Sequence, residues 1–173
     1  LLKDQVFGTC HGLSKLPYIR DTRRSIGIDK FVLKIADLSG NWTTGTVFTG
    51  TEFYDSVALG SYPCDIHGIK QCSYPDYIHN QKLPTLPYYI PFRALTNYKF
   101  SNLMVAGKTM AQSFLTNAAT RLHPIEWSSG TAAGASAAYM VLNKIKTTKD
   151  ALQQIDKIRA TVAQQTPIKW TIK

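Results

Sequence analysis

Two histidines are the residues best suited to acid–base chemistry. His123 stands between Leu122 and Pro124, and His67 follows Asp65 and Ile66. An imidazole changes its charge near neutral pH, so either ring could take a proton from an alcohol or an amine. Both are therefore candidates for a catalytic base. The alternatives are that His123 caps a backbone carbonyl in a loop and that His67 makes a structural hydrogen bond to Asp65.

The three cysteines, Cys10, Cys64 and Cys72, form an odd set. Cys64 and Cys72 could close one disulfide, which would leave Cys10 free or bridged to another chain. The sequence holds no C-x-x-C pair, and its four histidines lack the spacing of metal ligands. We therefore expect no structural metal site.

The chain carries a net charge of +9, from 20 basic and 11 acidic residues. This balance suits nucleic acid, an anionic membrane or an acidic partner. The basic residues are scattered, and no apolar run reaches the roughly 18 residues of a membrane-spanning helix. We expect a more acidic partner chain or ligand, no nucleic acid and no membrane span. The chain has a glycosylation sequon at Asn41, and its first residue is not Met. Both features favour a processed glycoprotein of the secretory pathway; the alternative is a protein of the cytoplasm.

The elements that must position these groups are clearest in the last third of the chain. Small residues recur at helical spacing after Ser128, which predicts a helix capped by Ser128 or Ser129. Its first N–H groups would suit an anionic or carbonyl oxygen, and its slim face would admit a flat ligand. Helix-on-helix packing is the alternative. The small residues of this face are Gly130, Ala133, Gly134, Ala137, Ala138 and Val141.

Short apolar runs predict strands over residues 31–35, 56–62, 88–90 and 103–106. The run at 103–106 is typical of a buried strand in a parallel sheet, whereas Pro91 places residues 88–90 at an edge or a bulge. The four prolines between residues 63 and 87 indicate an extended loop. A further helix is expected from about Thr148, with an apolar stripe at Leu152, Ile155, Ile158 and Val162.

Four segments together resemble one enzyme family. They are LPYIRDTRRSIG (16–27), ALGSYPCDIHG (58–68), YIPFRAL (89–95), and NLMVAGK (102–108) with GTAAG (130–134). They are similar, in the family's order, to its segments REtRRIxG, SYPxDIHG, YxIPYRaL and NLLVAGR…GqAAG. The chain thus resembles the FAD-dependent oxidoreductases of glutathione-reductase-like fold.

The resemblance implies an α/β protein, namely an α+β piece of a substrate domain with the closing strand and helix of a Rossmann-like FAD domain. Residues 1–100 would belong to the substrate domain, 101–146 to the FAD domain, and 147–173 to a C-terminal helix and tail. The G-x-G-x-x-G motif that holds the FAD pyrophosphate is absent from the sequence. We therefore expect a second polypeptide to carry it, and expect this chain to be a subunit or a processed C-terminal fragment.

The resemblance also implies roles for individual residues. Gly107 and Lys108 would lie beside the ribityl chain, and the N–H groups of residues 128–131 would stabilise the reduced flavin ring. Arginines 20, 23 and 24 could clamp a substrate carboxylate; the alternative is that they brace a sheet edge or pair with acidic groups across the domain interface. The loop TRLHP (120–124) is similar to the family's slRvmP but carries His123. The implied cofactor residues are Gly107, Lys108, Trp127, Ser128, Ser129, Gly130 and Thr131, and the implied substrate residues are Arg121, Tyr62 and Arg93.

The expected function is oxidation of a small organic substrate by hydride transfer to FAD, with His123 or His67 as the base. The alternative is a flavin- or pigment-binding protein of the same fold without turnover. A covalent flavin link through Cys10 or His11 is conceivable, but nothing in the resemblance requires it.

Overall fold

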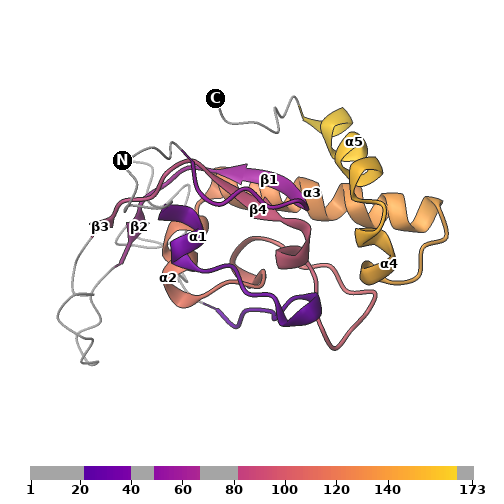
Figure 1. Ribbon diagram of the computed structural model, residues 1–173, viewed down its shortest axis with the longest axis horizontal. Coiled ribbons are helices and arrows are strands. Elements are labelled where there is room, and N and C mark those ends of the chain that lie inside the picture. Colours follow the sequence, from indigo (N-terminus) through magenta and orange to yellow (C-terminus); the bar gives the residue numbers. More distant parts are fainter. Residues whose placement is uncertain (1–21, 40–48, 67–81, 167–173) are drawn as a thin grey trace, which may run out of the picture.

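The computed structural model describes residues 22–39, 49–66 and 82–166 of the 173-residue chain. In these ranges, four short strands follow one another between helices on either side in the sequence, which confirms the expected mixed α/β class (Figure 1). The elements are η2 (Ile28–Lys30), α1 (Ile35–Ser39), β1 (Ser56–Gly60), β2 (Cys64–Asp65), β3 (Lys82–Leu83), β4 (Tyr88–Pro91), η4 (Phe92–Leu95), η5 (Gly107–Thr109), α2 (Phe114–Thr120), α3 (His123–Leu142), α4 (Thr148–Leu152) and α5 (Ile155–Gln165), where η denotes a 3₁₀ helix.

The central sheet of the described ranges consists of β1 and β4, which pair antiparallel from Ser56–Pro91 to Gly60–Tyr88. All four residues of β4 are buried, as are the first three of β1, so both runs lie in the core. The register shifts between Ser56 and Ala58, next to Pro91, where the missing N–H of proline is tolerated. The strands expected at 56–62 and 88–90 are thereby confirmed.

The long helix α3 packs against β1 on one side and against α5 on another (Figure 1). Ile125, Ala132 and Met140 carry its contribution to the core. The predicted start near Thr148 is also confirmed: Thr147 caps α4 by accepting the N–H of Asp150 at 3.1 Å. The expected apolar stripe then divides between α4 and α5. Leu152, Ile158 and Val162 are buried, and Ile155 is half-buried.

Two of the predicted strands are wrong. In the run 31–35, Leu33 makes only an isolated bridge to Gln112, and the chain then turns into α1 because the Asp37 carboxylate accepts the Lys34 N–H at 2.8 Å. In the run 103–106, Met104 makes one antiparallel bridge to Thr96, so no buried parallel strand forms there. Both runs carry strand-like side chains, but neither finds a neighbouring strand long enough to extend the ladder.

The predicted start of the long helix at Ser128 is also wrong, since α3 begins at His123. Pro124 suits the first turn because it lacks the N–H that would have no helical partner there. The Leu122 carbonyl accepts the N–H groups of Ile125 and Glu126 at 3.0 and 2.9 Å. The N–H groups of residues 128–131 consequently lie inside the helix, not at its open end.

Candidate active site

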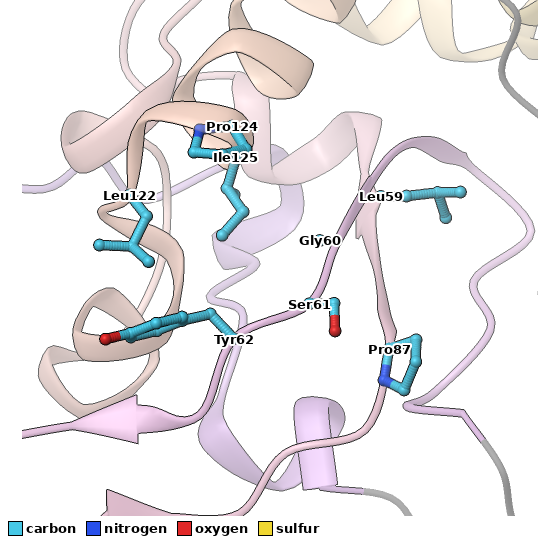
Figure 2. Close-up of a pocket in the computed structure, with 8 residues that line it drawn as sticks. All are labelled: Leu59, Gly60, Ser61, Tyr62, Pro87, Leu122, Pro124 and Ile125. Carbon is cyan, nitrogen blue, oxygen red and sulfur yellow. The ribbon is translucent and has the colours of Figure 1, made fainter.

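A cleft of about 520 Å³ lies where the end of β1 meets the start of α3 (Figure 2). Residues 59–62 form one wall, and Leu122, Pro124 and Ile125 form another, with Pro87 at the side. In Figure 2, Leu122 and Ile125 point toward the ring of Tyr62. The volume falls in the range of roughly 300–1,000 Å³ that is typical of small-molecule sites. Among the described residues that line it, all side chains are apolar apart from Ser61 and the Tyr62 hydroxyl.

Hydrogen bonds and close packing hold the two walls together. The N–H of Leu59 donates to Ser128 Oγ at 3.2 Å, which joins the end of β1 to α3. The hydroxyl of buried Tyr88 donates to the Ala119 carbonyl at 2.9 Å, and burial raises the pKa of this tyrosine. A Cβ at Gly60 would overlap the Tyr88 ring, so this position requires glycine.

The end of the cleft at Tyr62 is supported by buried groups. Arg121 is buried, and its Nη2 donates to the Asp65 carbonyl at 2.9 Å, while the Tyr62 hydroxyl lies 3.5 Å from Asp65 Oδ2. The thiol of Cys64 donates to the Leu115 carbonyl at 3.2 Å. Burial raises the pKa of the Cys64 thiol to about 11. The positive charge of Arg121 partly opposes this rise, and the negative charge of Asp65 adds to it. Cys64 is therefore a protonated thiol at neutral pH rather than a nucleophile.

A charged cluster lies at the first turn of α3. Glu126 Oε1 is 3.2 Å from Lys108 Nζ, and Glu126 Oε2 is 3.8 Å from Nδ1 of His123. The His123 side chain is 87% exposed, so the imidazole is open to an incoming molecule. The structure thus brings the predicted base His123 and the predicted cofactor residue Lys108 to the same carboxylate.

The turn at Gly107 is fixed by α3 and by a buried amide. Gly107 has φ +58°, a left-handed conformation that favours glycine, and its N–H donates to Ser129 Oγ at 3.0 Å. The buried Gln112 amide donates to the Gly107 carbonyl at 3.2 Å and to Asn117 Oδ1 at 3.3 Å. Its own oxygen accepts the hydroxyl of Thr120. The predicted cofactor residue Gly107 is therefore held on both sides.

The remaining predicted cofactor residues lie along α3. Trp127 is 75% exposed, Thr131 is half-buried, and a Cβ at Gly130 or Gly134 would meet no atom of the described chain within 4 Å. Ser128 and Ser129 instead direct their hydroxyls to Leu59 and Gly107, as described above. The open face at Trp127, Gly130 and Gly134 is therefore the part of α3 that another backbone or a flat group could approach closely.

Arg93, predicted to contact substrate, is engaged elsewhere. Its Nε lies 2.9 Å from Oδ2 of the fully buried Asp55, and its guanidinium lies over the rings of Phe31 and Tyr54 at 4.6 and 4.9 Å. Burial alone would lower the pKa of Arg93, but the hydrogen bond and charge of Asp55 raise it above its ordinary value. These contacts indicate a structural role, and a substrate role for Arg93 stays a prediction.

Several predicted residues lie outside the described ranges: His67, Asn41, Cys10, His11, Cys72 and Arg20. Within those ranges, no cluster of three potential metal ligands occurs, and no helix is both long and apolar enough to cross a membrane.

Sequence reasoning missed two parts of the site. The first is Glu126, although its spacing of three residues from His123 on a helix could have indicated the pair. The second is the apolar wall of Leu59, Leu122 and Ile125, for which no local signal exists because strand and helix are distant in sequence.

Comparison with known proteins gives one match. A family model described as "FAD dependent oxidoreductase" matches residues 3–162 of the chain. No curated protein and no solved structure matches.

Proposed function

The chain belongs to the FAD dependent oxidoreductase family, and on this premise we propose that it oxidises a small organic substrate at the cleft between β1 and α3. When bound, FAD supplies an acceptor for the hydride that leaves the substrate. One observation carries the proposal: the family-like segment at residues 59–62 and the first turn of α3 form the two walls of one small-molecule cleft.

The described residues fit a flat cofactor in two respects. Gly107 adopts a left-handed turn beside Ser129, and α3 leaves open space around Gly130 and Gly134. The absent side chains permit close approach at Gly130 and Gly134, whereas at Gly107 the space is taken by the Glu126 carboxylate, 3.2 Å from where a Cβ would lie. We assign the holding of the cofactor to Gly107, Lys108, Trp127, Gly130 and Thr131.

His123 is the proposed proton acceptor. Its sequence neighbours Leu122 and Pro124 both line the cleft, and its own side chain is 87% exposed beside Glu126, so the substrate hydroxyl must reach the ring from the cleft. The Glu126 carboxylate faces Nδ1 and so favours a proton on that nitrogen, which leaves Nε2 to accept the proton of the substrate. Tyr62 and Arg121 would shape the opposite end of the site.

We further propose that a second polypeptide supplies the G-x-G-x-x-G motif for the pyrophosphate, because no such motif occurs in these 173 residues. The open face of α3 at Trp127, Gly130 and Gly134 supports this, since it offers exposed aromatic and backbone surface to another chain.

The test uses the natively purified, FAD-loaded protein. Anaerobic stopped-flow absorbance identifies, from a panel of small alcohols and amines, one that bleaches the flavin. His123→Ala should then slow bleaching by about 10²–10⁴-fold, the usual contribution of a positioned base, and leave FAD content unchanged. His67→Ala is the matched control for the other candidate base.

Equal bleaching rates in wild type and His123→Ala would remove His123 from the mechanism. Bound FAD that no member of the panel bleaches would instead favour the non-catalytic flavin-binding alternative.

A further inference from the structure

The cleft between β1 and α3 also indicates what kind of substrate it takes. Resting on the proposed function, we infer that the substrate is an uncharged, ring-shaped alcohol that packs between Tyr62 and the side chains of Leu122 and Ile125 (Figure 2). The sequence suggested only an alcohol or an amine, and the family match leaves the substrate open.

The walls favour an apolar ring. Leu122 and Ile125 supply aliphatic surface, Pro87 and Pro124 supply rigid ring edges, and the Tyr62 ring supplies an aromatic face, whereas the Leu59 side chain points away from them (Figure 2). Figure 2 shows that Leu122 and Ile125 point toward that ring, so a flat molecule would be held between aliphatic and aromatic surfaces. An aromatic ring in such a position would bury apolar surface and could stack, in an offset arrangement, on the Tyr62 ring.

Among the residues that the structure describes, none that lines the cleft is charged, and the predicted substrate arginines are committed elsewhere. Arg121 Nη2 donates to the Asp65 carbonyl, and Arg93 pairs with Asp55. A carboxylate that entered the cleft would lose hydration without gaining a counter-charge from its walls. The cleft therefore discriminates against anionic substrates.

The two polar side chains of the described lining lie apart, Ser61 beside Pro87 and the Tyr62 hydroxyl on the opposite side of the view (Figure 2). Ser61 is exposed at the edge of the cleft, and the Tyr62 hydroxyl is directed to Asp65. With its ring among the apolar groups, an alcohol would direct its single hydroxyl past Leu122 and Pro124 toward His123, the proposed base, and few polar contacts suffice to fix orientation in a largely apolar pocket.

The test measures binding of N-phenyl-1-naphthylamine, a neutral probe whose fluorescence rises in apolar sites, to the natively purified FAD-loaded protein. Leu122→Glu places a charge in the cleft and should weaken probe binding about tenfold or more. Leu142→Glu is the matched control: this residue is 81% exposed at the other end of α3, about 30 Å away at 1.5 Å per residue. It should leave binding unchanged.

Competition then tests the charge of the ligand. We expect 2-naphthalenemethanol to displace the probe at concentrations at least about tenfold lower than 2-naphthoate, which has the same ring with a carboxylate. Equal displacement by the two compounds would overturn the inference, as would unchanged probe binding in Leu122→Glu.

FAD content, measured from absorbance after denaturation, distinguishes a substrate from the cofactor itself. If Leu122→Glu loses FAD in parallel with probe binding, the cleft holds the flavin ring and the substrate assignment is wrong. Should Leu122→Glu fail to fold, Tyr62→Ala removes the aromatic face without adding charge, and is expected to weaken the probe while retaining FAD. Probe binding needs no turnover, so failure of the proposed function would appear separately, as flavin that is not bleached.

Discussion

Replacing Arg93 with Gln should destabilise the protein strongly. The buried Asp55 carboxylate accepts three N–H groups of Arg93: the backbone N at 3.0 Å, Nε at 2.9 Å and Nη2 at 3.1 Å. Arg93→Gln keeps only the backbone donor and leaves the charge of Asp55 without its partner. Breaking a buried ion pair in this way costs about 3–5 kcal/mol. Because the Arg93 side chain is 20% exposed, we expect a loss near the lower limit, about 3 kcal/mol.

Thermal unfolding of the natively purified protein, followed by circular dichroism, measures this loss. For a protein of this size, about 3 kcal/mol corresponds to a fall in Tm of roughly 6–12 °C. The double variant Asp55→Asn/Arg93→Gln should recover part of it, because no buried charge remains. Lys99→Gln is the control, since this lysine lies on the surface over Tyr98, and should change Tm little. A fall of less than about 2 °C for Arg93→Gln, with an increased KM, would refute the structural role and restore Arg93 as a substrate residue.

Three further predictions concern single sites. Gly107→Ala should destabilise the fold by about 1–2 kcal/mol, because φ is +58° and the new Cβ would lie 3.2 Å from Glu126 Oε1; urea denaturation checks this, and no change in midpoint would contradict it. Cys64 should resist iodoacetamide at pH 8 in peptide mapping by mass spectrometry, because its pKa is raised to about 11. Between the ordinary value of 9.0 and 11 the folded state holds more protons than the unfolded state, so stability should fall as pH rises across that range. Gly134→Leu should leave the fold of this chain intact, since a Cβ there meets no atom, yet lower FAD content and partner co-purification; full retention of both would show that the open face of α3 is not used.

Local sequence patterns correctly predicted the strands and helices that pair or pack regularly with a neighbouring element. The apolar runs at 56–62 and 88–90 form β1 and β4 because they hydrogen-bond to each other as antiparallel strands. The apolar stripe from Leu152 to Val162 lies on α4 and α5. The run at 103–106 is also apolar but forms only an isolated bridge from Met104 to Thr96 and a hydrogen bond from the Val105 N–H to the Leu95 carbonyl. Strand formation depends on such a neighbour, which composition cannot reveal.

The start of α3 was misplaced because the small residues after Ser128 dominate the pattern. Pro124 was the signal that marks the true first turn. The helix was therefore expected to begin five residues too late, at 128 instead of 123, and so were the free N–H groups of its first turn.

The described structure brings only some of the predicted site residues together. His123 and Lys108 meet at Glu126, and Tyr62 and Arg121 both approach Asp65, neither of which was predicted from the sequence. The cleft itself arises from the contact between Leu59 and Ser128, which lie 69 residues apart. No local spacing encodes a contact of that kind.

Bound FAD tests the central claim most directly, that this chain works as part of a flavoenzyme. The natively purified protein should show flavin absorbance, release FAD identified by mass spectrometry in about equimolar amount, and lose the absorbance anaerobically when an alcohol substrate is added. Protein that carries no flavin, and that takes up none when FAD is supplied together with its co-purifying chain, would contradict it.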